Sequence, residues 1–415
     1  MSLISYSYFM PTRVECGNGI SGKIGEMIIE LGATRVLIVT DKGVRAANLL
    51  EGIEKSLLSV NLDYDIFDEV EPNPSVETIH KGTQYLSLHN SDAVLAVGGG
   101  SSIDAAKGIA VMATNSGNIL DYEGVEKISI PPLPIIAVPT TAGTGSEATN
   151  ATVVTNKEKS FKFGVISSYL FPSLAILDPA LTLQLPQGLT AAPGMDALTH
   201  AIESYTSKAA NPVSQALAIQ AIKMIGENLT KAYFVGTDIE ARENMLVASM
   251  IAGAAFAQSR LGNVHAISHT LGGVFNIPHG IANAALLPFI MKFNLRACPD
   301  KYKDIALALG NNVAGLSTMQ AAEKAIDTVI EMNQSMNIPL NIKEFGVSLE
   351  YVPKLVEDAM RSGNVFVNPR LTNAEDIQLI IERAYYGTLK ESETSSPKTF
   401  LDSKVPSHLK QRIEI

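Results

Sequence analysis

Short, wholly apolar runs alternate with longer amphipathic segments through the first half of the chain. The four clearest runs are RVLIVTD at 35–41, DAVLAVGGG at 92–100, PIIAVPTT at 134–141 and LAILDP at 174–179. Apolar strands separated by helix-length segments are typical of a parallel sheet that helices cover on both faces. We therefore expect an N-terminal α/β domain with a Rossmann-like parallel sheet.

The pattern changes near residue 185. Long segments rich in Ala, Leu and Ile follow, at 213–226, 241–260 and 317–336, with few β-branched runs. They predict a helical domain, so the 415 residues divide into an α/β domain at 1–185 and a helical domain at 186–415. The last stretch, 389–415, is polar and rich in Ser and Lys, which is typical of a surface tail.

Composition narrows the class of partner. Hydrophobic residues make up 46% of the chain and charged residues 18%, as in globular proteins, and the net charge of −10 disfavours nucleic acid and anionic membranes. A small-molecule partner is expected instead. The two cysteines, Cys16 and Cys298, form no disulfide framework, and no secretory or membrane-spanning pattern is present, so we expect a cytoplasmic protein.

A glycine-rich turn follows the second apolar run. Gly98, Gly99 and Gly100 lead into a helix that we expect to begin at Ser101 or Ser102. Glycines let a diphosphate approach the backbone, and the helix N-terminus favours its negative charge. A tight turn without a ligand would use the same glycines, and the spacing is not the usual dinucleotide fingerprint.

A second polar loop, PTTAGTGSE, follows the third apolar run at 139–147. Ligands of open α/β sheets bind at the carboxyl edge of the strands, so two such loops favour a dinucleotide site there. Asp41 ends the first run and suits either an adenosine ribose or a helix cap. It precedes Gly98 by 57 residues, the reverse of the usual Rossmann order.

Potential metal ligands concentrate between residues 200 and 279, which hold four of the seven histidines. Asp196 and His200 are four residues apart, so they share a face of the helix that we expect Pro193 and Gly194 to open. Oxygen and nitrogen donors without thiolate suit Fe(II), Zn(II), Mn(II), Co(II) or Ni(II).

Three further histidines complete this set of candidate ligands. His265 and His269 repeat the four-residue spacing, and His279 follows Pro278 at a turn that we expect Gly280 to end. The donors are then five, one more than a four-coordinate ion needs. Spacing alone permits all of them and does not show which one is excluded.

Taken together, these motifs resemble the iron-containing, or group III, alcohol dehydrogenases. The resemblance extends to about residue 388 and rests on GGGSSIDAAK, PTTAGTGSE, PGMDALTHAIE, HAISHTLGGVFNIPHG and NPRLTNAEDI. It implies a fold similar to that of dehydroquinate synthase, with an α/β domain followed by an all-α domain. It also implies reversible hydride transfer between a primary alcohol or short diol and NAD, in a homodimer.

The resemblance also assigns residues. The family's metal, with Fe(II) as first choice and Zn(II) or another divalent ion as alternatives, would be held by Asp196, His200, His265 and His279. His269 would lie close to the substrate and relay a proton. The implied dinucleotide contacts are Asp41, Asn73, Gly99, Gly100, Ser101, Asp104, Thr140, Thr141, Thr144, Lys162 and Leu181. Asp41 implies a preference for NAD over NADP.

Other functions remain open at this point. A hydroxyacid–oxoacid transhydrogenase would need the same residues, and a lyase or synthase on the same scaffold would reduce NAD only transiently. A metal- or nucleotide-binding regulatory module would carry out no turnover. The alcohol itself is not specified by the sequence, with Asn150, Val154 and Phe256 as candidate pocket residues.

Overall fold

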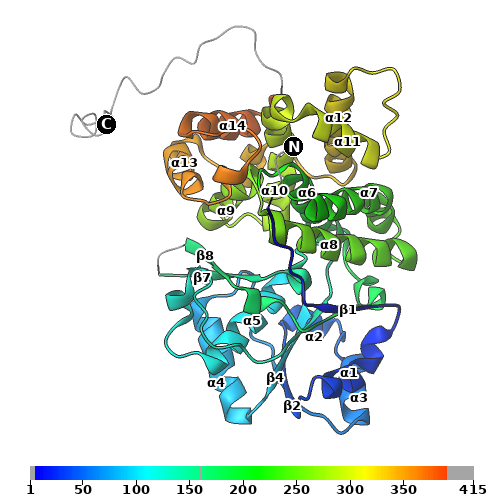
Figure 1. The fold of residues 1–415 in the computed structure, drawn as a ribbon, viewed down its shortest axis with the longest axis vertical. Coiled ribbons are helices and arrows are strands. Elements are labelled where there is room, and N and C mark those ends of the chain that lie inside the picture. Colours follow the sequence, from blue (N-terminus) through cyan, green and yellow to red (C-terminus); the bar gives the residue numbers. More distant parts are fainter. Residues whose placement is uncertain (1–4, 159–160, 390–415) are drawn as a thin grey trace, which may run out of the picture.

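A computed structural model describes residues 5–158 and 161–389 and contains a six-stranded parallel sheet (Figure 1). The strand order is β1-β9-β6-β4-β2-β3, and all five neighbouring pairs are parallel. The strands are β1 (Arg13–Cys16), β2 (Arg35–Val39), β3 (Asp63–Phe67), β4 (Ala93–Gly98), β6 (Ile135–Pro139) and β9 (Leu174–Leu177). The four predicted strands and their parallel sheet are confirmed.

Helices cover both faces of this sheet (Figure 1). They include α1 (Ile24–Glu30), α2 (Lys42–Ala46), α3 (Glu51–Ser59), α4 (Val76–His89) and α5 (Gly100–Thr114). Val36 of β2 is buried in one core cluster with residues of α1 and α3, whereas the next residue, Leu37, is buried in another with α4 and α5. Successive strand residues point to opposite faces, so apolar residues are needed at every position.

A smaller sheet was not predicted. It contains β5 (Gly124–Val125), β7 (Ala151–Asn156) and β8 (Phe161–Ile166), with β7 and β8 antiparallel. Side chains along β7 alternate between half-buried and buried, so this strand lacks a continuous apolar run. The β7–β8 hairpin carries Lys162 toward the helical region, where β8 contacts α9.

From Gln187 onward the described residues form helices and no strand, as predicted. These are α6 (Gln187–Thr206), α7 (Pro212–Phe234), α8 (Ile239–Ser259), α9 (Asn263–Phe275), α10 (His279–Asn294), α11 (Pro299–Ala308), α12 (Thr318–Ser335), α13 (Val352–Met360) and α14 (Ala374–Tyr386). The predicted helical segments correspond to α7, α8 and α12. No helix within 5–158 or 161–389 is long and apolar enough to cross a membrane. The predicted tail lies, apart from Leu389, outside the described residues.

The predicted start of α6 is wrong. Pro193 and Gly194 do not open this helix, which begins at Gln187 and contains Pro193 in its interior. Proline cannot donate a backbone hydrogen bond there. Tight packing accompanies this interior proline, because a Cβ atom on Gly143 would lie only 2.4 Å from the Cβ of Pro193. The polar loop of the sheet edge is thus in direct contact with the helix that carries Asp196.

The predicted turn at His279 and Gly280 is also wrong. His279 is the first residue of α10, and Gly280 continues the helix. A Cβ atom on Gly280 would lie 2.3 Å from the carbonyl oxygen of Ala192 in α6. This glycine is therefore used for close approach of two helices, which brings His279 next to the ligand candidates of α6.

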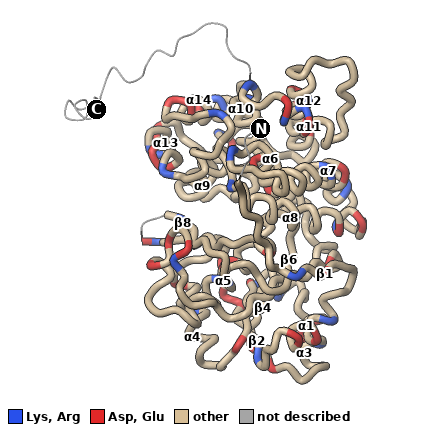
Figure 2. The backbone as a smooth tube through the Cα atoms, in the orientation of Figure 1, with Lys and Arg blue, Asp and Glu red and all other residues tan. Residues whose placement is uncertain are grey.

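Acidic and basic residues are interspersed along outer helices such as α3, α12 and α13 (Figure 2). Buried charged residues are few in the described part of the chain, and two of the six belong to α6 at the site described next. The six are Lys107, Glu147, Asp178, Asp196, Glu203 and Arg242.

Candidate active site

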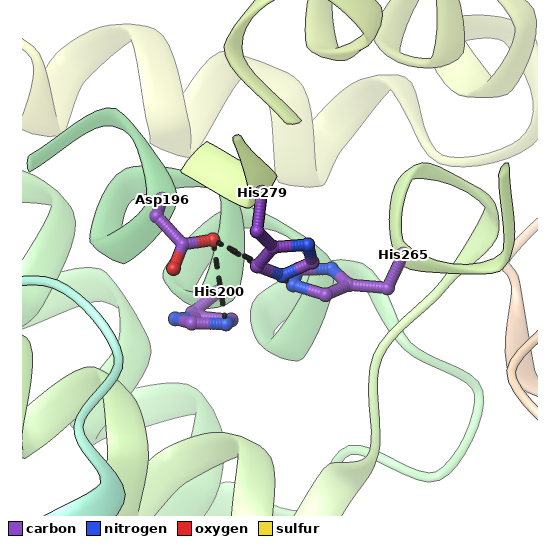
Figure 3. Close-up of side chains that lie close together, drawn as sticks. All are labelled: Asp196, His200, His265 and His279. Atoms are coloured by element: carbon purple, nitrogen blue, oxygen red, sulfur yellow. Dashed lines mark ion pairs between the residues drawn. The ribbon is translucent and has the colours of Figure 1, made fainter. Parts of the chain in front are cut away.

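Four potential metal ligands from three helices converge on one point (Figure 3). Asp196 and His200 come from α6, His265 from α9 and His279 from the start of α10, and one donor atom of each lies within 4.8 Å of the others. Asp196 Oδ1 is 3.7 Å from the Nε2 atoms of His200 and His279 and 3.8 Å from that of His265. The structure thus separates these four from His269, which spacing alone could not do.

Hydrogen bonds orient two of the imidazole rings toward this point. His200 Nδ1 lies 3.3 Å from the carbonyl oxygen of Gly143, and His265 Nδ1 lies 2.6 Å from Glu203 Oε2. Because both partners accept hydrogen bonds, each Nδ1 carries the proton and each Nε2 is unprotonated. This is the protonation that a metal-binding imidazole requires.

The charges and dimensions of the group fit a divalent cation. Burial raises the pKa of Asp196, and burial together with neighbouring histidines lowers the pKa values of His265 and His279 well below the usual range. A buried carboxylate among neutral imidazoles is stabilised by a cation. Tetrahedral ligands with metal bonds of about 2.0–2.2 Å lie roughly 3.3–3.6 Å apart. Asp196 Oδ1 is separated from the three Nε2 atoms by 3.7–3.8 Å, which is close to this range.

His269 lies beside this group rather than in it. It is one helical turn beyond His265 on α9, and its ring stacks on that of His279 at a centroid distance of 5.1 Å. Burial and the positive charge of Lys162 lower the pKa of His269 to about 4, with a smaller electrostatic contribution from His200. The ring is therefore neutral near pH 7 and able to accept a proton.

The three candidate pocket residues lie in different surroundings, and one of them is next to the metal-ligand candidates. The ring of Phe256 lies 4.6 Å from that of His200, so Phe256 borders the site. Val154 of β7 is fully buried in the core cluster that includes residues of α4 and α5. The carbonyl oxygen of Asn150 accepts a hydrogen bond from the backbone of Ser167, next to the small sheet.

Two polar residues at the site were missed by the sequence reasoning. Glu203 of α6 contacts His265, and Asn283 Nδ2 lies 2.6 Å from Asp196 Oδ1 and 3.1 Å from the Nε2 atoms of both His265 and His279. Burial raises the pKa of Glu203 to about 7. Helical spacing could have identified both residues, since they follow His200 by three positions and His279 by four.

The two polar loops at the sheet edge pack against each other. The backbone N–H of Thr140 donates to the carbonyl oxygen of Gly98 at 3.0 Å. A Cβ atom on Gly99 would lie 3.2 Å from Thr141 Oγ1, and one on Gly100 would lie 2.5 Å from the methyl group of Thr144. A side chain at position 100 would therefore displace Thr144, and one at position 99 would press against Thr141, so small residues allow the two loops to share one edge.

The helix after the glycine-rich turn starts slightly earlier than predicted. It begins at Gly100 with Gly99 as its N-cap, rather than at Ser101 or Ser102. No side chain caps this N-terminus. The first backbone N–H groups of α5 are thus well placed for an anionic group.

Asp41 is both a helix cap and a neighbour of this turn. Its Oδ1 accepts hydrogen bonds from the backbone N–H groups of Gly43 and Val44 at the start of α2. Its Oδ2 lies 3.3 Å from Ser102 Oγ. The helix-cap interpretation is therefore confirmed, while the contact of Asp41 with a ribose stays a prediction.

Asn73 and Lys162 meet across from the turn. Asn73 donates its backbone N–H to Ser101 Oγ at 3.1 Å, and its Oδ1 accepts a hydrogen bond from Lys162 Nζ at 2.8 Å. Burial lowers the pKa of Lys162. These residues border a cavity of about 260 Å³ between the small sheet and α9. Its lining is Glu71, Pro72, Asn73, Thr155, Lys157, Phe161, Lys162, Gly272, Gly273 and Asn276.

The remaining two cofactor candidates have structural partners of their own. Asp104 accepts hydrogen bonds from Ser146 Oγ and from the backbone N–H of Val153, each at 3.2 Å. Leu181 packs against the core under α1 and α3. Their contacts with a dinucleotide stay predictions.

Two family profiles match nearly the whole described chain. Residues 11–179 match the family described as iron-containing alcohol dehydrogenase, and residues 190–385 match the C-terminal part of the Fe-containing alcohol dehydrogenase family. The fold and the carboxylate–imidazole group agree with this match. The chain belongs to the iron-containing alcohol dehydrogenase family.

The alignments with named relatives cover almost the whole length of both sequences. It is 43% identical to the 1,3-propanediol dehydrogenase of Klebsiella pneumoniae, over 93% of this chain and 100% of the relative. It is 42% identical to the NAD-dependent methanol dehydrogenase of Bacillus methanolicus, over 91% and 99%. The crystal structure of a 1,3-propanediol oxidoreductase superimposes with a TM-score of 0.90 at 42% identity, covering 92% of this chain and 100% of that one.

Proposed function

We propose that this chain is a metal-dependent, NAD-linked alcohol dehydrogenase that interconverts a primary alcohol or short diol with its aldehyde. The largely buried group of one carboxylate and three imidazoles, beside the two polar loops at the sheet edge, carries this proposal. Relatives named for propanediol and methanol oxidation support the substrate class.

In this proposal the metal ion is held by Asp196, His200, His265 and His279. Fe(II) is the first choice, with Zn(II) or another divalent ion as alternatives. When bound, the ion supplies Lewis-acid stabilisation of the deprotonated alcohol and NAD supplies the hydride acceptor. The protein orients the donors, because Gly143 and Glu203 fix two of the rings.

His269 accepts the proton of the alcohol in the forward direction and returns it in the reverse direction. Its support is its neutral ring beside His279, within one turn of His265. Lys162 opposes protonation of His269 through its positive charge, and its bond to Asn73 places this charge near the site. A neutral imidazole is the form that a general base requires.

In this proposal the sheet edge would hold the dinucleotide, and the uncapped start of α5 would bind its diphosphate. Its contacts are Asp41, Asn73, Gly99, Gly100, Ser101, Asp104, Thr140, Thr141, Thr144, Lys162 and Leu181. Asp41 favours NAD, because its carboxylate accepts hydrogen bonds from ribose hydroxyls and repels a 2′-phosphate.

We place the domain division near residue 185, supported by the last strand ending at Leu177 and α6 beginning at Gln187.

We also expect a cytoplasmic homodimer. The two described cysteines form no disulfide, and β1 is an edge strand of the large sheet whose outer side can pair with a second copy. Light scattering after gel filtration measures the oligomeric state.

The decisive experiment is a panel of C2 to C6 alcohols, diols and aldehydes, assayed with NAD and NADP on metal-quantified protein. Alcohol-dependent accumulation of NADH is expected, strongest for a primary alcohol or short diol. Turnover of a hydroxyacid with an oxoacid but without consumption of free NAD would instead establish the transhydrogenase. Absence of any turnover after loading with Fe(II) or Zn(II) would refute the dehydrogenase.

A further inference from the structure

Helix α9 begins without a cap of its own, and a glutamate from another helix takes that place. The N-cap residue is Gly262, which has no side chain to accept a hydrogen bond. Glu203 Oε1, on α6, accepts the backbone N–H of Val264 at 2.7 Å. The carboxylate thus binds the positive end of α9, where it is stabilised by free N–H groups and the helix dipole.

The second carboxylate oxygen of Glu203 binds the imidazole that follows this N-terminus. Glu203 Oε2 lies 2.6 Å from His265 Nδ1, and both side chains are buried. Asp196, His200 and Glu203 lie at positions i, i+4 and i+7 of α6, on one face of that helix. One helix face therefore supplies two candidate metal ligands and the partner of a third.

We propose that Glu203 is a positioning residue that fixes the proton of His265 on Nδ1, so that Nε2 is free to bind the metal ion. This inference rests on the metal site of the proposed function. A buried imidazole takes either neutral tautomer, and the group facing Nδ1 decides which one is present. Glu203 Oε1 already accepts the N–H of Val264, and Oε2 faces Nδ1. In its ionised form the carboxylate only accepts hydrogen bonds, so it then selects the tautomer with a proton on Nδ1.

The backbone around Glu203 leaves room for this contact. A Cβ atom on Gly262 would lie 2.9 Å from Glu203 Oε1 and 3.2 Å from Asn368 Oδ1. Any larger residue at position 262 would therefore push the carboxylate away from α9. The glycine, the uncapped helix end and the carboxylate form one arrangement that holds His265 from its far side.

The variant Glu203→Gln tests this inference because it conserves volume and replaces one oxygen by an NH2 group. If the amide oxygen stays on Val264, the NH2 group faces His265 Nδ1 and moves the imidazole proton to Nε2. The ring then binds metal through Nε2 only after its proton returns to Nδ1, against the NH2 group. We expect metal affinity to fall by roughly 10- to 100-fold, measured by competition with a chromophoric chelator for Co(II) and Zn(II).

A second readout does not depend on metal or on activity. Long-range ¹H–¹⁵N spectra of metal-free protein labelled at histidine report which ring nitrogen carries the proton. The unmodified protein is expected to show His265 with its proton on Nδ1, and Glu203→Gln to show a shift to Nε2. Glu203→Asp keeps a carboxylate, so it should retain the Nδ1 tautomer even where its shorter side chain weakens metal binding.

Glu147→Gln is the matched control. Glu147 is also a buried glutamate, and its Oε1 has no hydrogen-bond partner among the described residues. It contributes no atom to the metal group, so this variant should keep both the His265 tautomer and the metal affinity. An unchanged tautomer in Glu203→Gln, or an equal loss of affinity in Glu147→Gln, would overturn the inference.

The outcomes separate this inference from the proposed function. If the unmodified protein binds no metal, or binds it equally well as His279→Ala, the metal site itself is refuted. If the unmodified protein binds metal at the site and Glu203→Gln binds it equally tightly, only the role of Glu203 is refuted.

Discussion

Ser102 Oγ lies 3.3 Å from Asp41 Oδ2, although 61 residues separate them in the chain. The order of the sheet explains this contact, because β2, which precedes Asp41, pairs directly with β4, which precedes the glycine-rich turn. In the usual Rossmann unit the acidic residue follows the glycine turn. Here it precedes the turn, yet neighbouring parallel strands bring the same two groups to one edge.

Replacing Asp41 should relax the choice between NAD and NADP. Asp41→Asn keeps a side-chain oxygen that can cap α2 but removes the negative charge that would repel a 2′-phosphate. We expect the ratio of kcat/KM for NADP to that for NAD to rise by about tenfold, equivalent to about 1.4 kcal/mol. Steady-state kinetics with both cofactors measure this ratio.

Asp41→Gly removes the cap as well as the charge, so it serves as the comparison. It should change the cofactor ratio similarly and lower the unfolding free energy by a few tenths of a kcal/mol relative to Asp41. A cofactor ratio that stays unchanged in both variants would remove Asp41 from the ribose site and leave it only as a cap.

The buried elements were predictable from sequence because their position determines their composition. The strand at 93–98 is buried at every residue, which forces a continuous apolar run. The edge strand at 63–67, DYDIF, is partly exposed and tolerates two aspartates, so its pattern is weak. The antiparallel β7–β8 hairpin was not predicted for a related reason. Burial alternates along both of its strands, so neither is apolar throughout.

The division of roles among the histidines could not be predicted from spacing. His265 and His269 are four residues apart on α9, as Asp196 and His200 are on α6, so spacing treats both pairs alike. The position of the start of α10 determines which histidine joins the other donors. Its close packing on α6 places His279 at the point where the other donors meet, and His269 is left stacked on the ring of His279.

The histidines should therefore differ in what their loss removes. His265→Ala and His279→Ala each delete one of four donors, so both should lose most of their bound metal. His269→Ala should keep its metal but lose about 10²–10⁴-fold in kcat, the usual contribution of a general base. Mass spectrometry of dialysed protein for metal content, together with kcat, separates the two classes.

His80→Ala provides the control for this series. His80 is exposed on α4, where its Nε2 lies 2.9 Å from Gln84 Nε2 and away from the metal ligands, so neither metal content nor kcat should change. Loss of metal in His269→Ala would contradict the assignment of roles, because it would make His269 a ligand.

Asn283→Asp should make stability depend more strongly on metal. The amide nitrogen of Asn283 lies 2.6 Å from Asp196 Oδ1, so the variant places two buried carboxylates together. Their repulsion should destabilise the metal-free protein by about 2 kcal/mol. A divalent ion offsets this repulsion, so saturating Co(II) should raise the unfolding temperature more in the variant than in the unmodified protein.

Asn333→Asp is the matched control for that comparison. Asn333 is fully buried and donates to the carbonyl oxygen of Ala284, beside Asn283 but away from the donor atoms. Its replacement should also destabilise the protein, but Co(II) should give no additional rise. Differential scanning calorimetry measures the unfolding temperatures. Equal rises on adding Co(II) in both variants would contradict a position of Asn283 beside the metal ion.

The free energy of unfolding should depend on pH through Glu71, which lies two residues before Asn73. Burial raises the pKa of Glu71, but hydrogen bonds from Thr78, Ser75 and Lys157 outweigh it and lower the pKa to about 2 from 4.5. The folded pKa is thus below the unfolded one, so Glu71 stabilises the protein above pH 4.5, and this contribution is lost as the pH falls toward 2. Glu71→Gln should lower the unfolding free energy by about 2 kcal/mol at pH 7, after allowance for partial exposure, and by less at pH 3.5. Urea unfolding at both pH values measures this difference, and a difference independent of pH would show that the carboxylate charge is not its cause.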